Sequence, residues 1–447
     1  MSLSWRDDNL LKRVLRNSGF LFSGNVVSAT LGFLQGILVV RLIGIEGYGL
    51  LAGTVFVFTT NVNRLLSFRM SEVAVKYLSK ALADNDRMRA AALVKGMGLI
   101  EIATSLLTYL VLFLLSPWAS QTFAKDLSAV LLFQVYGIYL LGNLVFETST
   151  GVLQTFKRFD RISTVQISGT ILTAAAIVAA FVLEGSLTHV LAAYLAGKLL
   201  AGFLIVVFAA RELNQALGPG WMRMRPASSM ISDWRALLGF SLNTNLNGTV
   251  NLIVRDSAPL FLGAFASQVE VGYFKLAHSL VISLVMLPIE PFIWTTYAEI
   301  AETVSNAQWD ATRRLLRRVS AIAAAWTLAA GGGLAAFGWW IIPLLYGADS
   351  APAYPAALIL ALGFGFANIL HWNRPLLLAF GKPSFPLIVS AVVGAGQIAL
   401  VFLLVPRFGY IGMSWLMTGY FIASIGVIVW RGLDEIRRRS ADREVNG

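Results

Sequence analysis

Long apolar segments alternate with short polar gaps along the whole of this 447-residue chain. Each segment has about 20 residues or more and few charges, which is the length that an α-helix needs to cross the hydrocarbon core of a bilayer. The pattern predicts an all-α polytopic membrane protein. Its twelve transmembrane helices are expected over residues 18–41, 48–68, 93–116, 127–152, 162–183, 187–210, 236–265, 271–298, 319–346, 353–376, 384–405 and 409–430.

The polar gaps divide the chain into two halves. The longest gap, residues 211–235, contains Gly218-Pro219-Gly220 and is interpreted as a cytoplasmic linker. Residues 1–210 and 236–430 would each form a six-helix bundle, and residues 431–447 a cytoplasmic tail. The gaps after the second and eighth spans are amphipathic and charged, so we expect helices there at the inner membrane interface.

The two halves also share sequence features, which indicates an internal repeat. Three pairs of equivalent positions lie 225 residues apart: Gly47-Tyr48 and Gly272-Tyr273, Asn143 and Asn368, and Lys157 and Lys382. Each half has six spans, an even number. The repeat is therefore expected to be parallel, with the two bundles related by an axis along the membrane normal.

Lysine and arginine are unevenly distributed over the gaps. Most of the 35 lie in the two terminal segments and in the even-numbered gaps, whereas Arg41, Lys125 and Arg407 fall in odd-numbered gaps. This positive-inside pattern predicts a multi-pass protein of the bacterial cytoplasmic (inner) membrane with both termini in the cytoplasm. The net charge of +11 then follows from topology, and no nucleic-acid partner is expected.

The composition argues against enzyme chemistry. Hydrophobic residues make up 57% of the chain and charged residues 13%, against about 25% charged residues in soluble domains. There is no cysteine, which excludes disulfides and thiolate sites. The three histidines lack metal-ligand spacing, and nucleotide-binding and hydrolase motifs are absent. We therefore predict no catalytic residue, metal or cofactor, and no cleavable signal peptide.

Polar residues inside the seventh span form a stripe with helical spacing. They are Asn243, Asn247, Asn251 and Arg255, four residues apart. An arginine facing lipid would be unfavourable by about 2.5–3.5 kcal/mol on insertion scales. The stripe is thus expected to face protein or water, either as a hydrogen-bond network between helices or as the wall of a polar cavity. Asn25 belongs to a fainter stripe in the first span.

Other ionisable residues lie within or beside the spans. Lys275 and His278 lie one turn apart in the eighth span, where Glu290 stands between two prolines that should break the helix. Asp256 follows Arg255. The candidates for ion coupling are Glu290, Asp256 and Glu147, and Lys198 is a possible partner of Glu101 or Glu147.

The chain resembles a known family in several segments. They are the opening Leu11-Lys12-Arg13, the turn from Gly44 to Gly49, the segment Gly151-Val152-Leu153-Gln154-Thr155-Phe156-Lys157-Arg158-Phe159, and the hairpin from Asp256 through Leu262-Gly263 to Val271-Gly272-Tyr273. These segments are similar to those of the polysaccharide biosynthesis (oligosaccharide flippase) family in the multidrug/oligosaccharidyl-lipid/polysaccharide exporter (MOP) superfamily.

The resemblance implies a function and a site. It implies two bundles around a central cavity lined by spans 1, 2, 7 and 8, where Arg255, Lys275, Arg41 and Arg64 would meet a diphosphate. The expected function is ion-coupled flipping of a polyprenyl-diphosphate-linked oligosaccharide, with a proton or sodium ion and, in the cell, polysaccharide polymerase and chain-length machinery as partners. The alternatives are a cation-coupled multidrug antiporter, a membrane glycan polymerase or ligase, and a scaffold without transport activity.

Overall fold

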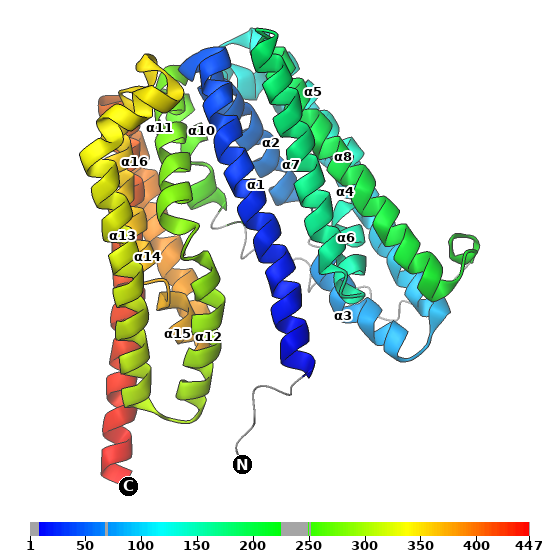
Figure 1. Cartoon of the computed structure of the whole chain (residues 1–447), viewed down its shortest axis with the longest axis vertical. Helices are drawn as coiled ribbons and strands as arrows, with labels where there is room; N and C mark the ends of the chain where they lie inside the picture. Colours follow the sequence, from blue (N-terminus) through cyan, green and yellow to red (C-terminus); the bar gives the residue numbers. More distant parts are fainter. Residues whose placement is uncertain (1–8, 68–69, 225–248, 250–251, 447) are drawn as a thin grey trace. The chain divides into compact units, whose positions relative to one another are not determined.

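The computed structural model describes residues 9–67, 70–224, 249 and 252–446. Every regular element in these residues is helical, and none is a strand (Figure 1). In a bilayer the backbone has no water to bond to, so a single chain satisfies its N–H and C=O groups most simply as helices. The prediction of an all-α polytopic membrane protein is confirmed.

The chain forms two compact units. Unit 1 consists of residues 1–42, 58–121 and 126–249, and unit 2 of residues 43–57, 122–125 and 250–447. Two short segments from the first half of the sequence thus belong to the second unit.

Unit 1 is built mainly from helices joined by short turns. Its elements are α1 (Asn9–Tyr48), α2 (Phe56–Leu66), α3 (Met70–Ala83), α4 (Arg87–Ala119), η3 (Leu127–Ala129), α5 (Val130–Gly142), α6 (Phe146–Thr155), α7 (Phe159–Val182), α8 (Leu187–Leu217) and η4 (Trp221–Arg223). The last residues of α1 and the first residues of α2 belong to unit 2.

Unit 2 repeats this order of long helices, short turns and one broken helix. Its elements are η1 (Gly49–Val55), η6 (Leu252–Asp256), α10 (Ala258–Phe265), α11 (Gln268–Val281), η7 (Ile282–Met286), α12 (Glu290–Ser305), α13 (Trp309–Tyr346), η8 (Ala348–Ser350), α14 (Ala353–Ile369), α15 (Asn373–Ala379) and α16 (Ser384–Asn446). The π-helical turn η2 (Ser120–Ala124) lies on the boundary between the two units.

Nine helical segments among the described residues are long and apolar enough to cross a membrane. Two of them, Gly24–Ala83 and Ser384–Ala441, have 60 and 58 residues, far more than the roughly 20 that one crossing needs. Gly44 and Gly409 have left-handed backbones and bend these segments beside the gaps predicted there. The predicted seventh span lies mostly outside the described residues. The observed elements otherwise follow the predicted order of spans.

Left-handed turn residues recur at equivalent places in the two halves. The pairs are Asn85 and Ala307, Lys125 and Gly347, Lys157 and Gly381, and Glu184 and Gly409, each 222 to 225 residues apart. The fourth span of each half is broken in the same way, between α5 and α6 and between α14 and α15, where the sequence predicted continuous helices over 127–152 and 353–376. These matches support the predicted repeat at an offset close to 225.

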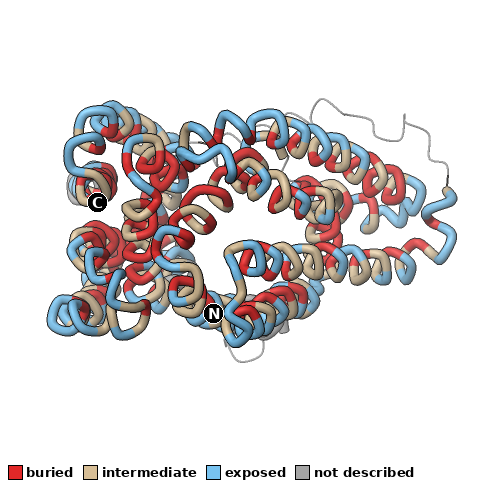
Figure 2. Tube along the Cα trace, turned by 90° about the horizontal axis from the view of Figure 1, so that it is seen from above, coloured by how far each residue is buried: buried red, intermediate tan, exposed pale blue. Residues whose placement is uncertain are grey.

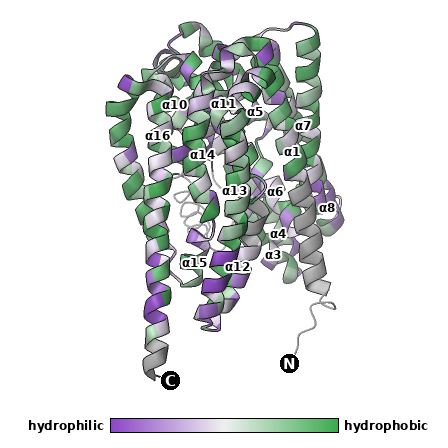
Figure 3. Cartoon of the chain, turned by 60° about the vertical axis from the view of Figure 1, so that its left-hand side comes forward, coloured by the Kyte–Doolittle hydropathy of each residue, from purple (hydrophilic) through white to green (hydrophobic). Residues whose placement is uncertain are grey.

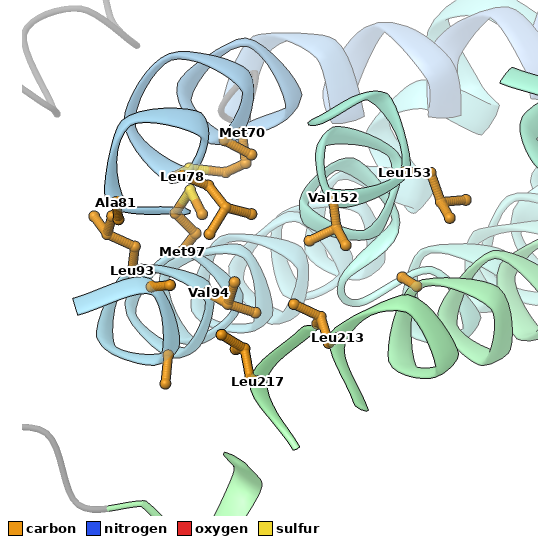
Figure 4. Packing of buried hydrophobic residues seen from close by; sticks show 14 of the residues in the cluster. Met70, Leu78, Ala81, Leu93, Val94, Met97, Val152, Leu153, Leu213 and Leu217 are labelled. Carbon is orange, nitrogen blue, oxygen red and sulfur yellow. The ribbon is translucent and has the colours of Figure 1, made fainter. Parts of the chain in front are cut away.

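The helix predicted at the inner interface after the second span is α3, and its apolar face is covered by protein. The cluster that covers it includes Met70, Leu78, Leu93, Met97, Val152 and Leu217 (Figure 4). Gly151 of α6 permits the close approach, because a Cβ at this position would lie 2.8 Å from the backbone oxygen of Ser71. Helix α3 is therefore held against α4 and α6 by packing as well as by its amphipathic sequence.

The outer faces of the long helices are apolar. Buried and exposed positions alternate along each helix (Figure 2), and hydrophobic residues cover most of the surface of α13 and of the first part of α16 (Figure 3). Large apolar side chains such as Leu114 and Leu328 are exposed by 66% and 72%. An apolar surface of this extent is typical of helices that face lipid, and polar residues gather toward the C-terminal parts of α12 and α16 (Figure 3).

Candidate substrate-binding site

The helix that carries Arg255 is interrupted beside it. The π-helical turn η6 ends at Asp256, and α10 begins with Ala258-Pro259, where proline is tolerated because the first amides of a helix have no intrahelical partner. Both the backbone N–H and the hydroxyl of Ser257 donate to the Leu252 carbonyl, at 2.9 Å each. Pro259 thus stands at a break in the helix.

Close packing fixes the position of this turn. Val254 lies against Gly394 of α16, where a Cβ would come within 2.3 Å of the valine side chain. The neighbouring Arg255 is half-buried, and its guanidinium carbon lies 5.0 Å from the centre of the Phe421 ring. Its Nε is buried and has no hydrogen-bond partner among the described residues. This leaves one buried arginine donor without a hydrogen bond in the part of the chain that the structure describes.

Two further basic side chains stand on α11. Lys275 and His278 are half-buried and lie one turn apart, and the charges of Lys275 and Arg255 both act on the His278 ring. Asp256 is exposed and lies within Coulombic range of Lys275. The structure thus brings the basic residues Arg255, Lys275 and His278 into one cluster, and its role as a substrate site stays a prediction.

Aromatic rings form one side of this cluster. The His278 ring is stacked on Phe274 at 5.9 Å and meets the edge of Phe364 at 5.3 Å, and Phe364 in turn contacts Phe421 at 4.7 Å. Phe421 is the ring beneath Arg255. The rings provide an apolar support with negative faces, which suits a cation. Sequence reasoning missed Phe364 and Phe421, because an aromatic residue in an apolar helix carries no distinguishing signal.

The break predicted in the eighth span is also present. After α11 the chain forms η7, and α12 begins at Glu290. Asn368 donates to the Val285 carbonyl at 3.0 Å and Trp326 donates to the Leu284 carbonyl at 3.1 Å. Neighbouring side chains, rather than a cavity, thus satisfy these two carbonyls. The side chain of Glu290 is outside the described residues, so its role stays a prediction.

A second pair of cations lies in unit 1. The Lys198 ammonium on α8 is 6.0 Å from the centre of the Tyr139 ring on α5, and Arg64 on α2 lies within Coulombic range of both residues. Lys198 and Arg64 are both exposed. Lys198 therefore shares its surroundings with another cation, and its predicted partners, Glu101 and Glu147, have other hydrogen-bond donors.

The remaining predicted residues are more scattered. Asn25 and Arg41 are exposed on α1. Gln35, in the same faint stripe as Asn25, donates to the Thr170 carbonyl of α7 at 2.9 Å, which favours helix packing for that part of the stripe. Asn243, Asn247 and Asn251 lie outside the described residues.

The fold defines the class: a polytopic membrane protein whose architecture is similar to that of the MOP-superfamily transporters and flippases. The chain belongs to the polysaccharide biosynthesis protein family, whose model matches residues 14–304. The resemblance drawn from the sequence is thereby confirmed.

Individual relatives are distant. The inner membrane protein YghQ of Escherichia coli (strain K12) is 24% identical over 276 residues, which cover 61% of this chain and 76% of that protein. The fold is similar to that of the lipid II flippase MurJ in an inward closed conformation, with a TM-score of 0.69, 16% identity and coverage of 95% of this chain and 91% of MurJ. An inward-facing multidrug resistance MATE family transporter gives a TM-score of 0.69, 14% identity and coverage of 93% and 96%. At these identities the structural likeness shows the fold.

Proposed function

We propose that this protein flips a polyprenyl-diphosphate-linked oligosaccharide across the inner membrane for polysaccharide biosynthesis or export. The observation that carries the proposal is the cluster of Arg255, Lys275 and His278 against Phe364 and Phe421. Ionisable residues inside transmembrane segments usually mark substrate or ion pathways, because their burial is otherwise unfavourable. Membership of the polysaccharide biosynthesis family and the MurJ-like fold support the same assignment.

The chemistry of a diphosphate matches these side chains. A guanidinium group presents donors in a planar fork that can bond two phosphate oxygens at once, and a lysine ammonium adds a compact charge. The Nε of Arg255, which has no hydrogen-bond partner among the described residues, supplies one such donor. Transfer of the headgroup from water into this cluster would replace its counterions by fixed cations, and the polyprenyl tail would stay in the bilayer.

The second pair of cations, Arg64 and Lys198, extends the same chemistry to unit 1. Tyr139 beside Lys198 offers both an aromatic face and a hydroxyl. Cations in both units suit an anionic headgroup, whereas a cation-coupled drug antiporter would require acids to face its substrate. The coupling ion, a proton or sodium, and the polymerase and chain-length partners stay predictions.

The test is transport of a fluorescent polyprenyl-diphosphate oligosaccharide in proteoliposomes that contain the full-length protein. Arg255→Ala should abolish flipping, since it removes the central donor, while the amount of protein in the membrane stays normal. Arg407→Ala is the matched control, because this arginine is exposed in a predicted outer gap. Unimpaired flipping by Arg255→Ala would refute the proposal, and export of cationic drugs in place of the glycolipid would favour the antiporter.

A further inference from the structure

A buried carboxylate stands opposite the start of a broken helix in unit 1. Helix α5 ends at Gly142 and α6 begins at Phe146. Glu101 of α4 is 4% exposed. Its two oxygens accept hydrogen bonds from the backbone N–H groups of Glu147 at 2.7 Å and Thr148 at 2.8 Å. The first amides of a helix lack intrahelical partners and favour a negative charge, so this arrangement stabilises the break.

A second carboxylate lies beside the first. The Ser71 hydroxyl of α3 and Oε2 of Glu147 are 2.6 Å apart, and Glu147 is the charged group within Coulombic range of Glu101 among the described residues. Within the described residues, no Lys, Arg or His nitrogen lies within 4.0 Å of either carboxylate. Glu101 is buried and Glu147 is half-buried, and two negative charges in such a site repel each other unless a cation joins them.

A buried hydroxyl without a regular hydrogen bond, that of Thr148, favours a proton as this cation. Thr148 is 4% exposed, and its hydroxyl lies beside the Glu101 carboxylate but makes no regular hydrogen bond to any described residue. A metal ion would need several oxygen ligands, whereas both oxygens of Glu101 are already directed at backbone amides. A proton needs only one carboxylate oxygen to bind it and one nearby hydrogen-bond acceptor.

The equivalent break in unit 2 uses neutral groups. There the Ser320 hydroxyl donates to the Ile369 carbonyl at 3.0 Å, and Trp372 donates to Ser320 at 2.7 Å. Asn368, the residue before the last one of α14, supplies two further hydrogen bonds. A broken fourth helix therefore forms without acids, so its architecture does not explain a pair of carboxylates in unit 1.

We propose that Glu101 and Glu147 bind one proton between them and that this pair couples transport to the proton gradient. The step is the reversible transfer of a proton to one carboxylate from a hydronium ion on the side of the membrane to which the site is open, and it leaves a neutral carboxylic acid and a water molecule. Protonated Glu147 can donate to Ser71, and ionised Glu147 accepts from it, so the contact persists while the charge changes.

Helix α3 can transmit this change to the substrate cations. Ser71 lies in the first turn of α3, which packs on α6 at Gly151. Arg64 lies in the last turn of the preceding helix, α2. Repulsion between two ionised carboxylates would push α6 away from α4, and α3, which stays bonded to α6 through Ser71, would move with α6 and shift Arg64. The coupling role rests on the proposed flippase function, whereas proton binding by the pair does not.

Proton binding can be measured without substrate. In infrared difference spectra of the purified full-length protein between low and high pH, the carboxylic-acid C=O band should be lost in Glu101→Gln and in Glu147→Gln. Glu72→Gln, an exposed neighbour of Ser71 on α3, should keep the band. Ser71→Ala should keep the band and shift its titration. This variant leaves both acids in place if the glutamine variants fail to fold.

The second arm measures coupling in proteoliposomes. A pH gradient should stimulate glycolipid flipping by the wild type, and Glu147→Gln should lose that stimulation but retain flipping down a glycolipid gradient. A band that persists in both glutamine variants overturns the proposal, as does a response to sodium in place of pH. If the band is lost but the wild type moves no glycolipid, the proton site stands and the flippase assignment fails.

Discussion

Replacing Asn368 by alanine should destabilise the protein, whereas the same change at its repeat equivalent, Asn143, should not. Asn368 is 1% exposed and donates to the Val285 carbonyl at 3.0 Å and to the Thr327 hydroxyl at 2.9 Å. The carbonyl oxygen of the Asn143 side chain is buried and has no hydrogen-bond partner among the described residues. The asparagine side chain at position 368 therefore donates two hydrogen bonds, whereas the side-chain oxygen at the equivalent position 143 accepts none from the described residues.

The magnitude follows from the number of bonds. Hydrogen bonds between membrane helices contribute about 0.6 kcal/mol on average and up to roughly 1.7 kcal/mol. Two lost bonds predict about 1–3 kcal/mol for Asn368→Ala, while Asn143→Ala should stay within about 0.5 kcal/mol. The free energy of unfolding in mixed detergent micelles, measured for both variants under one condition, provides the comparison. Equal destabilisation by the two variants would refute the reasoning.

Two further substitutions test packing and the aromatic support. Gly272→Leu should destabilise unit 2 by about 1–3 kcal/mol, because a Cβ there would lie 2.2 Å from the Ile45 carbonyl oxygen. The free energy of unfolding measures the effect, and Gly419→Leu is the control, because Gly419 has open space around it. Phe421→Leu should weaken binding of a polyprenyl diphosphate by about 0.5–2 kcal/mol, roughly two- to thirtyfold, through loss of the contact to Arg255; an unchanged dissociation constant would contradict that role.

The sequence predicted the fold where local signals are strong. Apolar segments of membrane-spanning length indicated the order of helices, and Pro288 and Pro291 marked a helix break that the structure contains. The break between α5 and α6 was missed, since that segment contains no proline and is mostly apolar. Its cap, Glu101, comes from another helix and approaches only in the folded protein. A contact that forms only in the folded protein does not change the local pattern of apolar and polar residues.

The candidate site was predictable in its charges but not in its neighbours. An arginine or lysine in an apolar segment is conspicuous, so Arg255 and Lys275 could be found from the sequence. Lys198 could also be found from the sequence, but its neighbours could not be predicted. Its position in the span is consistent both with pairing to an acid and with the contact to Tyr139 that the structure shows. Which ionisable groups face each other is decided by helix packing, as it is for Glu101 and Glu147.

The charge on the substrate clarifies what a proton site adds. A diphosphate diester carries about two negative charges, and each elementary charge that crosses the membrane is worth about 2.3 kcal/mol per 100 mV. Outward movement of the headgroup is therefore favoured by an inside-negative potential by about 4.6 kcal/mol per 100 mV, without any coupled ion. A proton bound at Glu101 and Glu147 would add a pH-dependent driving force to this electrical one. It follows that Glu147→Gln should lose stimulation by a pH gradient but keep its response to the membrane potential, whereas Arg255→Ala should lose both.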